Sequence, residues 1–182
     1  MSNSKIKIFA ITGSTRKNSS NYKILKYISE NLKTEFEVEI FEDLEELPHF
    51  NPDLDTENPP EVITFFRDKI ALADGIIICT PEYVFSLPGS LKNALEWCVS
   101  TTIFSKKKIG LITASASGEM GHEQLILIMK TLEAQFKDEN LLLIQGVRGK
   151  INEEGKIIND ETLVAVGKFI TNFEKEFLSE IS

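Results

Sequence analysis

Short apolar stretches alternate five times with longer stretches of helical periodicity along this 182-residue chain, and few folds accommodate such a pattern. The apolar stretches have the length of strands, and they predict β-strands over residues 5–12, 36–41, 75–80, 108–114 and 141–145. The other stretches have apolar residues three or four positions apart, and they predict helices over residues 22–32, 62–73, from 88 onward, 123–137 and 163–177. The chain is therefore predicted to be an α/β protein.

The predicted strands carry few polar residues on either face; residues 75–80, for example, read GIIICT. Such strands fit a parallel sheet that is covered by helices on both faces, because neither face then meets water. Right-handed crossovers leave few topologies for five βα units, and they favour the flavodoxin-like three-layer sandwich with strand order 2-1-3-4-5. Since no internal repeat or linker is evident, residues 1–182 are expected to form a single domain.

Charge and composition exclude several classes of function. The net charge of −8 and the pI near 4.9 argue against a nucleic-acid-binding protein, which needs a basic face. No stretch approaches the ~18 apolar residues of a membrane span, and no signal-like apolar segment is evident, so a cytoplasmic protein without a membrane partner is expected. Cys79 and Cys98 are expected to be small core residues. His49 and His122 are too few for a metal site and are expected at the surface.

Polar and glycine residues gather in three segments that follow the first, third and fourth predicted strands, namely 13–21, 81–89 and 115–121. In a sheet of this order, ligands bind beyond the carboxyl ends of the strands where the strand order reverses, so these segments are expected to line one crevice. The first segment leads into a helix N-terminus, and it carries the cations Arg16 and Lys17 together with several small polar residues. That combination predicts a phosphate site; the alternative is a hydrophilic loop with an ordinary serine N-cap.

Other ligand and enzyme classes lack their motifs. No G-x-x-x-x-G-K-[ST] is present, and no G-x-G-x-x-G follows the first strand, so a Walker-type nucleotide site and a dinucleotide fingerprint are excluded. A receiver domain would need acidic residues where Thr12 and Thr80 stand. The segment around Ser115 does not read G-x-S-x-G, which excludes that kind of hydrolase.

Two of the polar segments carry long motifs. Residues 13–21 read G-S-T-R-K-N-S-S-N, and residues 81–97 read P-E-Y-V-F-S-L-P-G-S-L-K-N-A-L-E-W. They resemble the G-S-x-R-x-x-S-x-N and P-E-Y-N-x-S-x-P-G-x-L-K-N-A-[IL]-[DE]-W motifs of the NADPH-dependent FMN reductases. The resemblance extends over nearly the whole chain, including the turn at 152–156.

This resemblance implies bound FMN and a set of residues that hold it. The residues that match the phosphate-binding positions are Ser14, Arg16, Ser19, Ser20 and Asn21. Those that match the stretch around the isoalloxazine ring are Pro81, Glu82, Tyr83 and Val84, and those at the edge of the flavin are Ser115, Ser117 and Gly118. Val84 stands where the family usually carries asparagine, which removes a polar group from the pocket. No catalytic acid or base and no metal ligand is assigned, because the flavin carries the redox chemistry.

The activity that the resemblance implies is transfer of hydride from NADPH or NADH, through the flavin N5 atom, to quinone, azo, chromate or flavin acceptors in a ping-pong cycle. Two alternatives stay open: a flavodoxin-like electron carrier without turnover, and an interaction protein that responds to the redox state of its flavin. Arg148 and Lys150 are candidates for a nucleotide 2′-phosphate.

The run of apolar residues at 125–129 covers more than the single stripe that a surface helix needs, so a homodimer or homotetramer is expected; the alternative is deeper burial within one chain.

Overall fold

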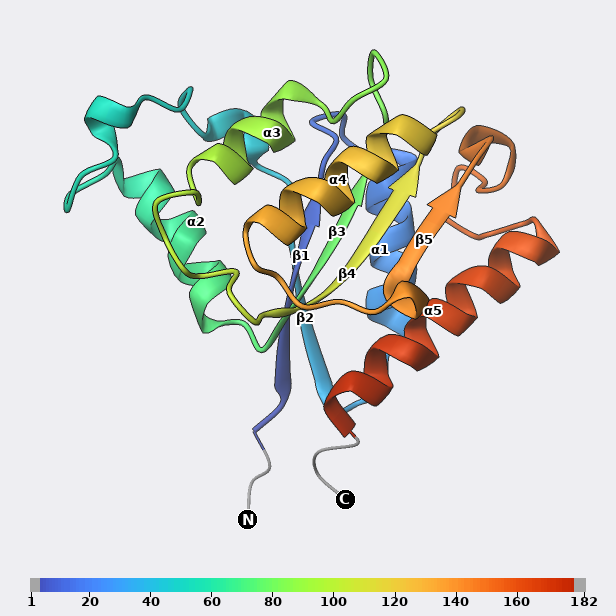
Figure 1. Ribbon diagram of the computed structural model, residues 1–182. Helices are drawn as coiled ribbons and strands as arrows, with labels where there is room; N and C mark the ends of the chain where they lie inside the picture. The colour runs from blue at the N-terminus through green and yellow to red at the C-terminus, as the bar shows by residue number, and fades with distance from the viewer. Residues whose placement is uncertain (1–3, 179–182) are drawn as a thin grey trace.

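The computed structural model describes residues 4–178, which contain one five-stranded parallel sheet in the order β2-β1-β3-β4-β5 (Figure 1). The strands are β1 (Ile6–Thr12), β2 (Phe36–Phe41), β3 (Gly75–Thr80), β4 (Lys108–Ala114) and β5 (Leu141–Ile144). The predicted strand order and the flavodoxin-like fold are therefore confirmed. In this order the sequence of strands reverses between β1 and β3, which is where such sheets bind ligands.

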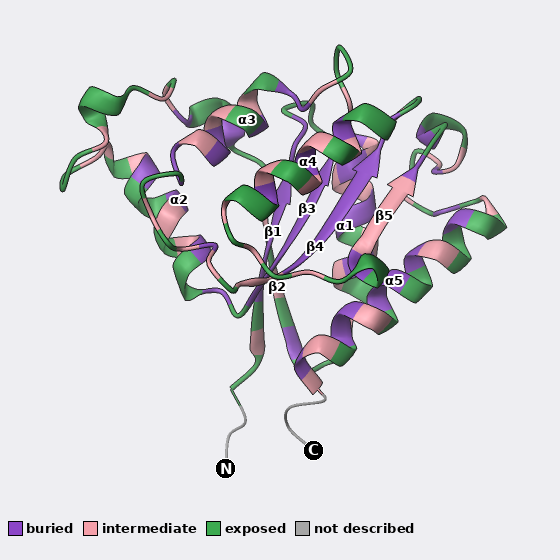
Figure 2. Cartoon of the chain, in the orientation of Figure 1, coloured by how far each residue is buried: buried purple, intermediate pink, exposed green. Residues whose placement is uncertain are grey.

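Helices cover both faces of the sheet (Figure 1). One face carries α1 (Ser20–Asn31) and α5 (Asp160–Leu178), and the other carries α2 (Glu61–Leu72), α3 (Gly89–Glu96) and α4 (Glu119–Thr131). Side chains alternate along β3, so Ile76 and Ile78 join the core under α2, α3 and α4, whereas Ile77 and Cys79 join the core under α1 and α5. All of β3 is buried, as Figure 2 shows. No described helix combines the length and apolarity that crossing a membrane requires.

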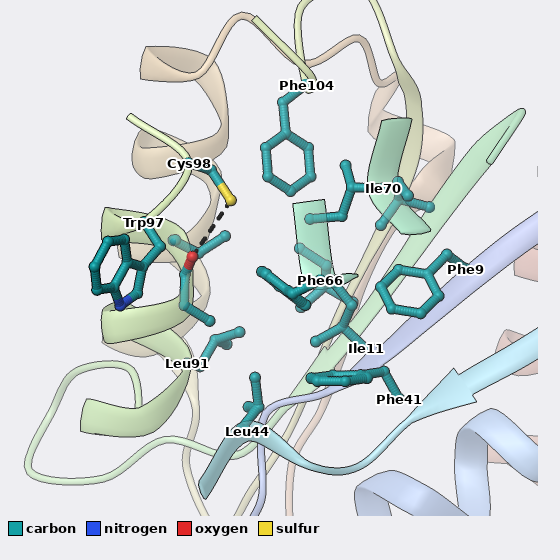
Figure 3. Close-up of a cluster of buried hydrophobic side chains, with 14 of the residues drawn as sticks. Phe9, Ile11, Phe41, Leu44, Phe66, Ile70, Leu91, Trp97, Cys98 and Phe104 are labelled. Carbon is teal, nitrogen blue, oxygen red and sulfur yellow. Dashed lines mark hydrogen bonds between the residues drawn. The ribbon is translucent and has the colours of Figure 1, made fainter. Parts of the chain in front are cut away.

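The long connection between β2 and α2 is anchored by an indole and a guanidinium group. Trp97 is fully buried, donates from Nε1 to the carbonyl oxygen of Pro48 at 2.7 Å, and packs edge-on against Phe50. Arg67 on α2 pairs with Asp55 at 2.7 Å and also donates to the carbonyl oxygen of Trp97. Figure 3 shows the hydrophobic core on this face of the sheet, which includes Leu44 of this connection. Short 3₁₀ turns occupy Leu44–Glu46 and Pro52–Leu54 here, and Asp138–Asn140 and Val147–Gly149 elsewhere.

The helix predicted over residues 123–137 is wrong at both ends, because α4 runs from Glu119 to Thr131. Glu133 has a φ of 60°, which ends the helix. Gln135 then pairs with the start of β4: its N–H donates to the carbonyl oxygen of Lys107 at 2.8 Å, and its carbonyl oxygen accepts from the N–H of Ile109 at 2.9 Å. Pairing with the sheet therefore replaces the last predicted helical turns.

Candidate functional site

The loops that follow β1, β3 and β4 meet at the carboxyl end of the sheet, as predicted, and the loop after β5 joins them. They enclose a cavity of about 400 Å³, within the range of roughly 300–1,000 Å³ that is typical of small-molecule sites. The residues that line it are Ser14, Arg16, Ser19, Ser20, Asn21, Pro81, Glu82, Tyr83, Ala114, Ser115, Ala116, Gly146, Val147 and Arg148. Polar groups from segments far apart in the sequence thus converge on one space.

Three of the residues predicted to contact a flavin lie outside this lining. Val84 is 94% exposed at the tip of a hairpin, and Ser117 is also exposed. Gly118 is buried at the start of α4 with a φ of 95°. Conversely, Gly146 and Val147 line the cavity although no sequence motif marks them, and Arg148, a candidate for a nucleotide 2′-phosphate, lines it as well. The position of β5 beside β4 is the signal that predicts all three, since the loop after β5 must reach the same edge of the sheet.

The loop between β1 and α1 presents hydrogen-bond donors to the cavity. Ser19 is the N-cap of α1, and its Oγ accepts a backbone N–H of the first helical turn at 3.1 Å. The Oγ of Ser14 accepts the backbone N–H of Arg16 at 3.3 Å. A hydroxyl that accepts in this way keeps its own hydrogen for donation. Within residues 4–178, the backbone N–H groups of Ser20 and Asn21 have no protein acceptor, as befits the start of a helix. Unpaired donors at a helix N-terminus are groups that bind anions in proteins, so this loop is a candidate anion site.

The charges around the cavity also favour an anion. Arg16 and Arg148 both line it, and in the described part of the chain neither guanidinium has an ion-pair partner. Glu82 is the acidic residue of the lining, but its Oε2 accepts the N–H of Gly121 at 2.8 Å, at the N-terminus of α4. The helix dipole there offsets its negative charge.

A second cavity of similar volume, about 390 Å³, lies between β2 and the C-terminal end of α2. It is lined by two glutamates, Glu37 and Glu39, as well as by Lys7 and Lys69. Lys69 is already paired with Glu39 at 2.7 Å, and the C-terminal end of a helix disfavours anions. The cavity at the carboxyl end of the sheet is therefore the better candidate site.

The loop after β3 is a tight hairpin that is fastened to α4. Tyr83 and Ser86 exchange two backbone hydrogen bonds, at 2.9 and 3.0 Å. The two residues between them, Val84 and Phe85, have φ values of 51° and 58°, which is the type I′ geometry. The Oγ of Ser86 donates to Oε1 of Gln124 at 2.5 Å, and Nε2 of Gln124 donates to the carbonyl oxygen of Phe85 at 3.1 Å. The wall of the cavity is thus held by α4 as well as by the sheet.

Replacing Val84 with asparagine should stabilise the protein by about 1 kcal/mol, because a β-branched side chain is strained at positive φ and asparagine tolerates it. Urea unfolding at pH 7 measures the change. Ile158→Asn is the matched control, since Ile158 is also β-branched and exposed, at 57%, and has no positive φ. If Val84→Asn fails to exceed Ile158→Asn in stability, backbone strain at residue 84 is not the reason for the effect.

The loop after β4 is tied to the β3 loop and to α4. The Oγ of Ser115 donates to the carbonyl oxygen of Glu82 at 3.3 Å, which links the two loops across the cavity. Beneath them, Oγ1 of Thr113 lies 2.9 Å from Nδ1 of His122. The prediction that His122 lies at the surface is wrong: it is half-buried, and burial lowers the pKa of its imidazole, so the ring is neutral at pH 7.

Comparisons with known proteins agree with this fold. The family model described as NADPH-dependent FMN reductase matches residues 6–147. The subunit CrdA of the NADH:(hydroxy)cinnamate reductase of Vibrio ruber is 29% identical, over 90% of this chain and 83% of its own length. A 2-hydroxy-1,4-benzoquinone reductase of a Burkholderia species is 29% identical, over 92% of this chain and 94% of its own. Among solved structures, the flavoenzyme FerB, an NAD(P)H:(acceptor) oxidoreductase from Paracoccus denitrificans, shares the fold with a TM-score of 0.80 at 24% identity, covering 92% of this chain and 94% of its own.

Proposed function

The chain belongs to the NADPH-dependent FMN reductase family, and we propose that it holds FMN in the cavity at the carboxyl end of its sheet. It is an oxidoreductase that acts on small-molecule acceptors. Bound FMN would supply the redox chemistry, namely hydride transfer from NADPH or NADH through the flavin N5 atom to a quinone, azo, chromate or flavin acceptor in a ping-pong cycle. The observation that carries the proposal is the group of unpaired hydrogen-bond donors at the N-terminus of α1, at one side of a cavity of suitable volume.

The residues around α1 would hold the phosphate group. The free N–H groups of Ser20 and Asn21 and the hydroxyl hydrogens of Ser14 and Ser19 would donate to its oxygens, and the guanidinium of Arg16 would offset its charge. These groups are already fixed by the N-cap and the loop, so little ordering is needed on binding.

The loops after β3 and β4 would hold the ring. Pro81, Glu82 and Tyr83 would contact it mainly through backbone groups, because the Glu82 carboxylate is already bonded to α4. Ser115, with Ser117 and Gly118 nearby in sequence, would border its edge. The chain would therefore orient the ring mainly through backbone groups. The position of Val84 outside the lining, at the exposed tip of the hairpin, is consistent with this.

The visible absorption spectrum of the purified protein tests the proposal. We expect the two bands of an oxidised flavin, release of FMN on denaturation, and steady oxidation of NADPH or NADH when a quinone is present. A protein that stays colourless after incubation with excess FMN would rule the function out. FMN binding without turnover would instead favour the electron carrier, which the cation Arg16 argues against.

We also propose that the chain assembles as a homodimer or homotetramer through the surface between α3 and α4. Residues 125–129 are the apolar run that predicts a second buried face. Leu125 and Met129 of this run face the core, whereas Leu127 is 64% exposed. Val99, 60% exposed, lies in a groove that α3 and α4 form with Ile128. Apolar residues of this size on one face mark an association surface.

Replacing Leu127 with lysine should weaken self-association about tenfold, which is near the ~1.5 kcal/mol gained by burying a leucine side chain. Sedimentation velocity over a range of concentrations gives the dissociation constant. Leu72→Lys is the control, because Leu72 is 72% exposed on α2 and lies off this surface. A wild-type protein that sediments as a monomer would contradict the proposed assembly.

A cytoplasmic location is proposed as well, in keeping with two free, buried cysteines that a reducing compartment would preserve.

A further inference from the structure

Cys79 lies directly beneath the proposed phosphate site and has no role in the function described above. It is the residue before the last of β3, it is fully buried, and its Sγ donates to Oδ1 of Asn21 at 3.3 Å. In the parallel register Cys79 pairs with Thr12 of β1, so the thiol faces the first turn of α1 from below. Asn21 is the second residue of α1, is 4% exposed, and lines the cavity.

The thiol determines which way the Asn21 amide is turned. Burial raises the pKa of the Cys79 thiol far above its ordinary value, so the sulfur keeps its hydrogen and acts as a donor. Oδ1 of Asn21 accepts that hydrogen, and Nδ2 must then point away from the sheet. In the described part of the chain Nδ2 has no acceptor. The described side-chain atoms that are buried and lack a hydrogen-bond partner are Oγ1 of Thr12 and Oδ1 of Asn140, so Nδ2 of Asn21 is accessible to solvent. It therefore opens onto the cavity that Asn21 lines.

We infer that Cys79 is a positioning residue: its thiol holds the Asn21 amide with Nδ2 toward the cavity, where Nδ2 adds a side-chain donor for the phosphate of FMN. The inference rests on the proposed function. The orientation of the amide decides whether Asn21 strengthens or weakens FMN binding, because the opposite rotamer would turn the carbonyl oxygen of the amide toward the phosphate. A buried donor on the sheet side is what makes one orientation better than the other.

Alanine and serine at residue 79 test this role, with FMN and riboflavin as the two probes. The full-length protein is freed of flavin, and both affinities are measured from the quenching of flavin fluorescence. Cys79→Ala should weaken FMN binding about tenfold, as expected for losing an oriented bond to a charged group, and should change riboflavin binding by less than about threefold. Cys79→Ser restores a donor and should return the FMN affinity to within about threefold of the wild type.

Cys98 provides a matched control. It is 1% exposed, burial raises the pKa of its thiol to about 12, and its Sγ donates to the carbonyl oxygen of Ala94 at 3.3 Å. Figure 3 shows that it belongs to the core on the other face of the sheet. Cys98→Ala removes the same sulfur atom, so it should leave the ratio of FMN to riboflavin affinity unchanged.

The results that would overturn the inference are distinct from those that would overturn the proposed function. Equal losses of FMN and riboflavin affinity in Cys79→Ala would mean that Cys79 only packs, and the same conclusion follows if serine fails to restore FMN binding. Wild-type affinity for FMN in Cys79→Ala would also overturn the inference, while leaving the proposed function intact. A wild-type protein that binds neither probe would overturn the proposed function itself, and the inference with it.

Discussion

Replacing Arg67 with alanine should lower the free energy of unfolding by about 3–5 kcal/mol, which is the usual cost of removing one partner of a buried ion pair. The side chains of Arg67 and Asp55 are only 13% and 7% exposed, and their N–O distance is 2.7 Å. Arg67 also donates from Nε to the carbonyl oxygen of Trp97 at 2.7 Å and lies over the indole ring. The variant would leave Ser100 as the remaining donor to the Asp55 carboxylate and would remove the Arg67 donor from the carbonyl oxygen of Trp97. Urea unfolding followed by the fluorescence of Trp97 measures the loss.

Lys69→Ala is the matched control for this prediction, because Lys69 is a cation two residues further along α2 that also forms an ion pair. It pairs with Glu39 at 2.7 Å, but the two side chains are 31% and 53% exposed. Solvent screens such a pair, so its removal should cost no more than about 1 kcal/mol. Similar losses in the two variants would mean that burial of the Arg67 pair does not determine its contribution.

The same ion pair predicts how stability depends on pH. Burial opposes ionisation of Asp55, but hydrogen bonds from Ser100 and Arg67 and the charge of Arg67 outweigh it and hold the pKa of Asp55 below its ordinary value of 3.8. A lowered pKa in the folded state contributes stability above pH 3.8, and that contribution is lost as the pH falls through the folded-state value. The free energy of unfolding should therefore fall less steeply at low pH in Arg67→Ala than in the wild type, as measured by urea unfolding between pH 2 and 7. The same fall in both proteins would mean that the lowered pKa of Asp55 does not contribute to the loss of stability in acid.

Replacing Arg16 with alanine should weaken FMN binding about 10- to 100-fold, since a hydrogen bond to a charged group contributes ~1.5–3 kcal/mol. Arg16 lines the cavity beside the free N–H groups at the start of α1, and no acidic side chain of the described residues forms an ion pair with it. Its charge is therefore available to a phosphate dianion. Fluorescence titration of the flavin-free protein with FMN gives the affinity.

Lys17→Ala separates a specific contact from a general effect of charge. Lys17 is the next residue, is also an exposed cation, and does not line this cavity. Its removal should change the FMN affinity by less than about threefold, with an effect that disappears at high salt. Equal losses in the two variants would show that Arg16 contributes only to the overall field. Unaltered FMN affinity in Arg16→Ala would remove its proposed role altogether.

Much of the architecture follows from pattern alone. Strands such as β3, which are apolar on both faces, fit a sheet with helices on both sides, and right-handed crossovers then favour the order β2-β1-β3-β4-β5, which the structure has. Because that order brings the carboxyl ends of β1, β3 and β4 to one edge, the loops that begin at Gly13, Pro81 and Ser115 could be assigned to one cavity before their geometry was known. The motif in the first loop also sufficed to place Arg16 and the start of α1 there.

The remaining features arise from contacts between segments that no local pattern relates. α4 ends at Thr131 because Gln135 pairs with β4, although the residues between them continue an apolar periodicity. Val84 adopts a positive φ because the hairpin closes between Tyr83 and Ser86, against the preference of valine itself. Cys79 and Asn21 are 58 residues apart, and they meet because β3 lies beside β1 under α1. Hydrophobic periodicity is a property of each segment, so it can be recognised in the sequence. The hydrogen-bond partner of each polar atom depends instead on which segments the folded sheet brings together.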